Sequence, residues 1–195
     1  MAQDAALLTG GPTAVYVDDG AGDIDIGFTK DGVELTGEIA YMDLITDQLG
    51  ETIANSVLNG VRNVEVKFNF AQWDLLLIAR AFPNSVKLQD DTTATKKAVD
   101  FRALAGSTLL SRAKKWTLKP HDPTTGIATT DKAHWVTIWK ATPSGPLSQS
   151  FSSGNQRVIP VTLRVFPDTS KSNSFFWWGD PTVVDANESG FTALP

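Results

Sequence analysis

Alternation of apolar and polar residues with a period of two is the feature that most limits how this sequence can fold. Within Val61–Phe70, apolar side chains occupy every second position from residue 64, and within Asn155–Phe166 the same alternation starts at residue 159. Successive side chains of a strand point to opposite faces, so the pattern predicts half-buried β-strands. The buried faces would consist of Val64, Val66, Phe68 and Phe70 in the first strand and Ile159, Val161, Leu163 and Val165 in the second.

Weaker runs of the same kind predict further strands between turn residues. In the run Asp23–Phe28, Ile26 and Phe28 would share one face with Ile24. The Asp31-Gly32 turn signal predicts a hairpin from this run to the next, Val33–Ala40. The remaining strands are expected over Thr13–Val17 and Ala133–Ala141, with one or two more within Val99–Leu118.

A single helical segment interrupts the strand pattern. Residues Ala71–Phe82 are mostly apolar, Asn69 can cap their first turn, and Pro83 would end the helix. Seven or eight strands with one helix predict a mainly β fold. We expect an antiparallel β-sandwich or half-barrel with one flanking α-helix.

At 195 residues, the chain has the size of one domain with arms. We expect an N-terminal arm over 1–12, a β-sandwich domain over 13–168 and a C-terminal arm over 169–195 with an aromatic anchor at Phe175–Trp178. Residues 41–60 have no period and predict a long inter-strand loop, which at that length usually has a function. The polar residues 84–97 predict another loop, and Pro160 predicts a sheet edge or a bulge.

Charge is divided unevenly along the chain. The first 60 residues hold eleven Asp and Glu and a single base, Lys30, whereas the other 135 hold eleven acids and sixteen Lys or Arg. The net charge is thus near −10 in the first part and near +5 in the second, which gives the total of −5. Such a division predicts a separate acidic surface. We interpret it as a surface that repels a polyanion, on a subunit that associates with copies of itself.

The sequence offers no recognisable catalytic, metal or cofactor site. It has no cysteine, and its two histidines, His121 and His134, have no evident acid–base partner. The acids between residues 18 and 25 do not follow the spacing of a Ca²⁺ loop. Glu34 and Glu38 would lie roughly 13 Å apart on one strand face, which is too far for a glycosidase pair. We therefore expect neither enzymatic activity nor a cofactor.

Membrane insertion and DNA wrapping are also not expected. No run of apolar residues is long enough for a membrane-spanning helix, and Met1–Gly11 lacks the pattern of a secretion signal. The pI near 4.9 argues against a protein that wraps DNA, because phosphate binding requires a basic face.

An ordered series of segments covers most of residues 30–168. It begins with Gly32–Thr36, Ile45–Gly50 and the strand at Val61–Phe70, and continues with Gly106-Ser107 and Ala113–Pro120. It ends with Val136–Ala141, Arg157–Leu163 and Phe166–Asp168. In this order the segments resemble the tail tube proteins (major tail proteins) of long-tailed bacteriophages. The Trp-rich C-terminal arm lies outside the resemblance.

The resemblance implies a fold, an assembly and a location. Such subunits are β-sandwiches with a flanking helix, and they form rings, usually hexameric, whose inner strands join into one barrel. The rings stack into the tube of a virion tail, which is assembled in the bacterial cytoplasm and conducts the genome to the host. The partners would be copies of the chain and other tail proteins, and DNA would pass through the lumen without specific binding.

These expectations assign two groups of residues. Carboxylates that face a channel repel phosphate, so the polar faces of the early strands are the candidates for the lumen. The lumen-facing candidates are Asp23, Asp25, Glu34, Thr36, Glu38, Glu65, Lys67 and Asn69. The candidates for contacts between rings are Asp43, Asp47, Glu51, Trp177 and Trp178.

Other functions remain open at this point. The chain could be another tube or ring protein: a type VI secretion-like tube subunit, a tail terminator or a head decoration protein. Less favoured is a carbohydrate-binding β-sandwich that stacks sugars on Trp135, Trp139, Trp177 or Trp178, because that function leaves the charge division unexplained.

Overall fold

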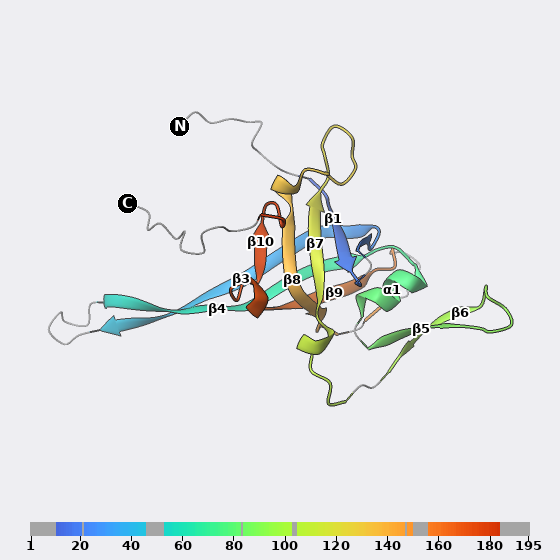
Figure 1. Ribbon diagram of the computed structural model, residues 1–195, viewed down its shortest axis with the longest axis horizontal. Coiled ribbons are helices and arrows are strands. Elements are labelled where there is room, and N and C mark those ends of the chain that lie inside the picture. The colour runs from blue at the N-terminus through green and yellow to red at the C-terminus, as the bar shows by residue number, and fades with distance from the viewer. Residues whose placement is uncertain are drawn as a thin grey trace.

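A mainly β architecture is what the computed structural model shows over the residues it describes, which are 11–20, 22–45, 53–82, 84–102, 105–146, 148–149 and 156–183 (Figure 1). The strands are β1 (Thr13–Asp18), β2 (Asp23–Asp25), β3 (Thr29–Ile45), β4 (Ile53–Phe70), β5 (Ser85–Gln89), β6 (Lys97–Phe101), β7 (Lys114–Pro120), β8 (Val136–Pro143), β9 (Ile159–Phe166) and β10 (Phe176–Trp178). The helix α1 spans Leu75–Ala81, and short 3₁₀ turns occupy η3 (Leu110–Arg112), η4 (Lys132–His134) and η5 (Thr169–Lys171).

One antiparallel sheet dominates the fold. Its strand order is β2-β1-β7-β8-β9-β4-β3, and β10 pairs with β8. The first half of β8 pairs with β10 and its second half with β9, so the sheet divides at this strand. β1 and β3 also contact each other although they lie near opposite ends of the strand order, which means that the sheet curls toward closure. The predicted antiparallel, half-barrel-like fold with one helix is therefore confirmed.

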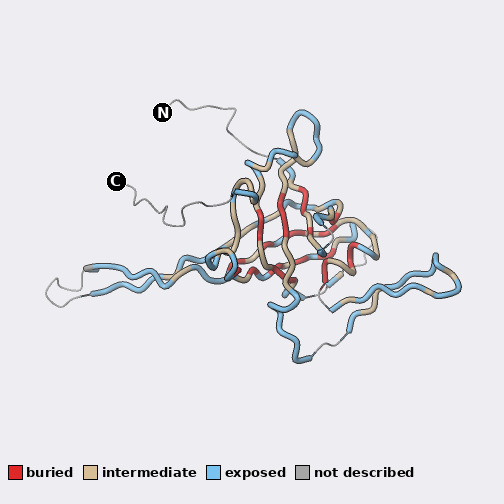
Figure 2. Tube along the Cα trace, in the orientation of Figure 1, coloured by how far each residue is buried: buried red, intermediate tan, exposed pale blue. Residues whose placement is uncertain are grey.

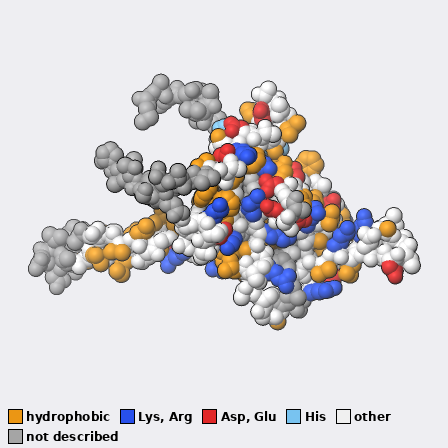
Figure 3. All heavy atoms as spheres, viewed as in Figure 1, with side chains coloured by type: hydrophobic (Ala, Val, Ile, Leu, Met, Phe, Trp, Pro, Cys, Tyr) orange, Lys and Arg blue, Asp and Glu red, His pale blue; other side chains and the backbone are white. Residues whose placement is uncertain are grey.

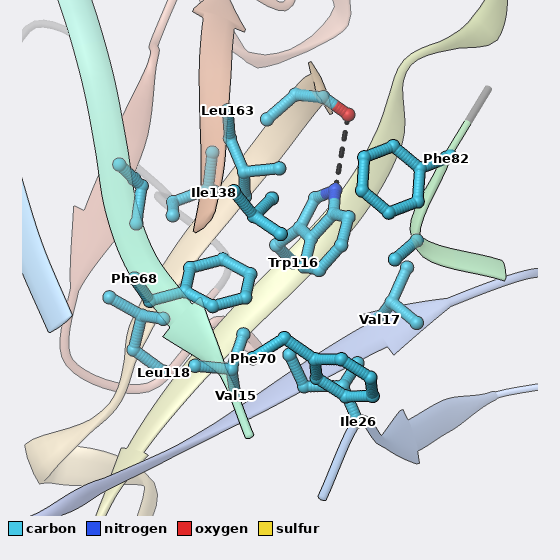
Figure 4. Packing of buried hydrophobic residues seen from close by; sticks show 14 of the residues in the cluster. Val15, Val17, Ile26, Phe68, Phe70, Phe82, Trp116, Leu118, Ile138 and Leu163 are labelled. Atoms are coloured by element: carbon cyan, nitrogen blue, oxygen red, sulfur yellow. Dashed lines mark hydrogen bonds between the residues drawn. The ribbon is translucent and has the colours of Figure 1, made fainter. Parts of the chain in front are cut away.

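The core lies inside this curl, where the two strands with the clearest alternation, β4 and β9, pair side by side and turn their apolar faces to the same side of the sheet (Figure 2). Val64, Val66, Phe68 and Phe70 of β4 are almost fully buried, as are Ile159, Val161, Leu163 and Val165 of β9. Trp116 of β7 lies at the centre of the cluster: its ring centroid is 6.2 Å from that of Phe68, and its indole N–H donates to the Ala141 carbonyl at 3.1 Å (Figure 4). The predicted buried faces of both strands are confirmed.

The helix begins later than expected. Asp74, rather than Asn69, is its N-cap and accepts hydrogen bonds from the Leu76 and Leu77 N–H groups. Residues 71–74 are not helical, so the prediction of a helix from Ala71 was wrong at its start. Asp74 is the better cap because it lies immediately before a continuous apolar run, in which Leu77, Ile78 and Ala81 are buried against the core.

The Asp31-Gly32 pair does not form the predicted hairpin. β2 pairs with β1, not with β3, and Asp31 and Gly32 lie inside β3 with φ of 65° and 81°. Lys30 pairs with Asn69 and Val33 with Phe68, so three steps along β3 match one step along β4. The two residues form a bulge, because a bulge needs the same positive φ as a tight turn.

Two predicted loops are strands. Within 41–60, residues 41–45 belong to β3 and residues 53–60 to β4, so the expected long loop is mostly an extended β-ribbon. Within 84–97, residues 85–89 form β5, which pairs with β6 as a separate two-stranded sheet. The C-terminal segment also contributes to the fold, since β10 joins the main sheet. The division into arms at 1–12 and 169–195 remains a prediction, and residues 1–10 and 184–195 lie outside the described residues.

Pro160 lies on a strand inside the sheet, but at a position that is paired on one side. It pairs with Asn69 of β4, whereas the pairing of β9 with β8 extends only from Leu163 to Phe166. The missing N–H group of proline therefore faces a stretch without a ladder, which agrees with the predicted local edge.

Trp116 gives a direct test of the core. Replacement of Trp116 by Ala should lower the free energy of unfolding by about 3–5 kcal/mol, because it leaves a large cavity and removes the indole hydrogen bond to the Ala141 carbonyl. The control Trp178→Ala, at a residue that is 76% exposed, should change it by less than about 0.5 kcal/mol. Urea unfolding followed by circular dichroism measures both, and equal losses would contradict the placement of Trp116.

Candidate interaction surface

The β3–β4 pair continues beyond the core as a protruding ribbon, which we define as residues 39–45 of β3 and 53–61 of β4 (Figure 1). Hydrophobic side chains are exposed along it (Figure 3). The exposed fraction is 40% or more for each of Ile39, Tyr41, Met42, Leu44, Ile45, Ile53, Val57, Leu58 and Val61. A concentration of this kind on one element marks an interaction surface rather than scattered surface residues.

Among the described residues, no second layer covers the ribbon. Tyr41 pairs with Leu58 and Ile45 with Ile53, and apolar residues occur on both faces because Tyr41 and Met42 are adjacent. Seven residues of β3 extend roughly 20 Å at the usual rise per residue. A two-stranded ribbon with both faces in water is marginal by itself, so this element is expected to be covered in the functional state.

The structure brings six of the eight lumen candidates together on one surface. Glu34 pairs with Lys67, which pairs with Thr162; Thr36 pairs with Glu65, which pairs with Arg164. Cross-strand partners point to the same face, and the intervening residues of β4 and β9 form the core. We call this surface the outer face; it consists of Glu34, Thr36, Glu38, Arg62, Glu65, Lys67, Asn69, Thr162 and Arg164.

The acids of the outer face are matched by bases. Arg62 lies 2.7 Å from Glu38, and Lys67 lies 3.4 Å from Glu65. Hydrogen bonds from Arg62 and then Asn63 lower the pKa of Glu38. The outer face is thus an ion-paired surface and not a purely acidic one, a pairing that the composition of the early strands alone did not predict.

Asp23 and Asp25 do not join the other six candidates. They lie on β2, at the other end of the strand order from β3. Asp23 forms ion pairs with Lys115 at 3.1 Å and Lys119 at 3.1 Å, and Asp18 pairs with Lys115 at 3.2 Å. Part of the charge division therefore reflects pairing between the acidic β1–β2 corner and the basic β7.

The candidates for contacts between rings are in two places. Asp43 lies on the ribbon and accepts a hydrogen bond from the Ser56 hydroxyl at 2.6 Å, while Asp47 and Glu51 lie outside the described residues. On β10, the Trp177 ring packs edge-on against Trp139 with a centroid distance of 5.1 Å, and Trp178 is exposed. The rings of Trp139 and Trp177 are nearly perpendicular, with an interplanar angle of 86°, and so do not form a coplanar pair.

Other site chemistry is sparse in the described part of the chain. His134 lies 3.6 Å from Asp131 in an exposed pair. Within the described ranges, no three His, Asp or Glu side chains form a group that could hold a metal ion. No helix among the described residues has the length and apolar character needed to cross a bilayer.

Sequence reasoning missed the exposed residues of the ribbon and also Phe28. Phe28 was expected on the same face as Ile26, but Ile26 is fully buried and Phe28 is 79% exposed. The available signal for the ribbon was its composition: β-branched and aromatic residues that continue beyond a strand without alternation.

A scan of the sequence against protein-family models finds no match, and a search of curated proteins finds no relative. The structure resembles a chain in a cryo-EM structure of an extracellular contractile injection system, the PVC sheath–tube complex in its extended state. The TM-score is 0.50 with 13% sequence identity, over 82% of this chain and 88% of that chain. The comparison shows a shared fold over most of both chains, and that fold is found in a sheath–tube complex.

The acidic corner gives a pH-dependent test. Hydrogen bonds from the Gly20 N–H group, and then from Lys115, lower the pKa of Asp18. Because the folded-state pKa lies below the unfolded value, the contribution of Asp18 to stability is present above about pH 4 and is lost as the pH falls through the folded pKa.

Asp18→Asn keeps an acceptor for Gly20 but removes the charge. We expect it to lower the free energy of unfolding by roughly 1 kcal/mol near neutral pH, with the difference from the unmodified chain vanishing in strong acid. Urea unfolding as a function of pH measures this. A difference that stays constant down to strong acid would show that the charge is not the cause.

Proposed function

We propose that this chain is a structural subunit, not an enzyme, that assembles with copies of itself into rings stacked as a tube. The observation that carries the proposal is the apolar ribbon, which is unstable in water by itself and extends beyond the body of the subunit. The shared fold with a chain of a sheath–tube complex supports it.

Ring formation would use the free edge of the sheet. In the described part of the chain, β3 is the last strand of the order and pairs on one side only. A long unpaired edge is a template for another strand, and closure of several copies into a barrel removes it. We propose hexameric rings in which such edges join, with the ribbon extending along the tube axis to the next ring.

We propose that the outer face, which is the side of the sheet turned away from the core, lines the lumen of the assembled tube. A basic lining would retain DNA by releasing its counterions, whereas a lining whose bases are paired with acids gives phosphate little net attraction. The Arg62–Glu38 and Lys67–Glu65 pairs fit a conduit that DNA crosses without binding. On this proposal the chain belongs to the tail of a bacteriophage and conducts DNA into the host, with other tail proteins as partners.

A tube of an injection device without a genome is the second candidate function, and the similarity to the contractile injection system favours it. The two functions predict the same rings and the same ribbon contacts. They differ in whether purified native particles that contain this chain carry DNA.

Assembly can be tested at the ribbon. Leu58 is 68% exposed and pairs with Tyr41, so Leu58→Asp should leave the subunit folded but prevent the formation of tubes. Negative-stain electron microscopy and sedimentation velocity measure assembly, and thermal unfolding checks the fold. The matched control is Ile127→Asp, at an equally exposed residue outside the ribbon, which should still assemble. Normal tubes from Leu58→Asp would contradict a role for the ribbon.

The orientation of the outer face can be tested with an introduced thiol, because the chain has no cysteine. In assembled tubes, Glu34→Cys should react with a small maleimide but not with a polyethylene-glycol maleimide too large to enter the lumen. The unassembled subunit should react with both reagents, and so should tubes of the control Asp91→Cys, at an exposed residue near the β5–β6 turn. Rapid reaction of Glu34→Cys tubes with the large reagent would show that this face lies on the exterior of the tube and not in the lumen, which would contradict the proposal.

A further inference from the structure

Two exposed aromatic residues lie at the end of the β3–β4 pair that is opposite to the ribbon. Phe28 directly precedes β3, and Trp73 follows the end of β4 by three residues. Their exposed fractions are 79% and 61%, and Leu76 at the start of α1 is 36% exposed. We call Phe28, Trp73 and Leu76 the aromatic platform. The ribbon and the platform are thus the two ends of one continuous β-ladder.

Hydrogen bonds hold Phe28 in its exposed position. Its N–H group donates to the Gln72 side chain at 3.3 Å, and its carbonyl accepts from the Ala71 N–H at 2.9 Å. Gly27 has a φ of +89°, and a Cβ at this position would overlap the Gln72 side chain, so the turn requires glycine. Ile26 is buried on one side of this turn, which fixes Phe28 on the other. The exposed ring is therefore presented by a fixed backbone, as expected of a preorganised contact residue.

The charges of the ribbon indicate what kind of surface it contacts. Asp43 is the one charged residue of the ribbon as defined, which has no Lys or Arg. Two ribbons packed symmetrically on each other would bury two Asp43 carboxylates with no ribbon base to pair with them, which disfavours a ribbon-to-ribbon contact. Beside the platform, Asp25 accepts a hydrogen bond from Gly27 and Asp74 accepts one from Leu76, and a base, Arg157, lines a 260 Å³ hollow together with Trp73.

We propose that the aromatic platform of one copy binds the apolar ribbon of a second copy. This inference rests on the proposed function, because it specifies the contact that stacks one ring on the next. A contact between opposite ends of identical subunits is heterologous, and it repeats without closing, as the growth of a tube requires. Both faces of the ribbon are apolar. Phe28 and Trp73 of a subunit in the next ring can therefore cover one face, while a neighbouring subunit of the same ring covers the other.

The first experiment measures assembly of the full chain. The double variant Phe28→Ala/Trp73→Ala should raise the protein concentration needed for tube formation by at least about tenfold, as loss of two aromatic anchors does at interfaces. Its thermal unfolding should be unchanged, because both side chains are exposed. The control Ile127→Ala should assemble like the unmodified chain.

The second experiment identifies the partner surface. The photo-reactive analogue p-benzoylphenylalanine is placed at position 28 in isotopically light protein, which is assembled with unmodified heavy protein and irradiated. Trypsin releases the whole ribbon as one peptide, 31–62, because no Lys or Arg lies between Lys30 and Arg62. We expect light 1–30 joined to heavy 31–62. Cross-links to another segment, such as 84–102, would overturn the inference.

The possible failures are distinguishable. If the unmodified chain forms tubes and the double variant forms them equally well, the inference is wrong and the proposed function stands. If the unmodified chain forms neither rings nor tubes under any condition, both are wrong, since no second copy is then bound.

Discussion

The β3–β4 ladder is longer than the core that supports it, and the other features of the molecule follow from this mismatch. From Val64 to Phe70, the apolar face of β4 belongs to one buried cluster with the apolar face of its neighbour β9, with α1 and with Trp116. Beyond Gly37 and Val64 the same two strands continue without a second layer from the described part of the chain, and their apolar side chains are exposed. Register shifts at Asn63 and Gly60, both with positive φ, twist the ladder where it leaves the core. A subunit built in this way is packed in one half of its longest element and exposes apolar side chains in the other half.

The sequence predicted the elements whose pattern is set by the core of the same chain. β4 and β9 alternate cleanly because each has one buried face, and their buried residues were identified correctly. The ribbon was interpreted as a loop for the converse reason: with no intramolecular core, nothing requires period two, and apolar residues occur on both faces. Asp31-Gly32 was interpreted as a hairpin because bulges and tight turns need the same backbone conformation, and only the pairing partner distinguishes them. β5 was missed because a largely polar strand of a hairpin resembles a loop in sequence.

The candidate site was predictable in part. The alternation in β3 and β4 placed Glu34, Thr36, Glu65 and Lys67 on one face, as the structure has them. The positions of Asp23 and Asp25 could not be predicted, because they depend on the pairing of β1 with β7, about a hundred residues away in sequence. The same long-range pairing brings Lys115 and Lys119 to the acidic corner. The charge division is therefore partly a consequence of folding: an early acidic segment and a later basic strand attract each other within one subunit, and only the remaining charges are available for partners.

The free edge of β3 and the ribbon are parts of one element, and this connects the two directions of the proposed assembly. Pairing of β3 with a neighbouring strand in a ring would order the ladder from which the ribbon extends. It would thereby reduce the conformational entropy that the ribbon loses when it binds the next ring. A single subunit in solution lacks this ordering, and Asp43, with no Lys or Arg on the ribbon, also disfavours contacts between ribbons. Stacking is therefore expected to follow ring closure, so that growth occurs at the end of an existing tube rather than by aggregation of free subunits.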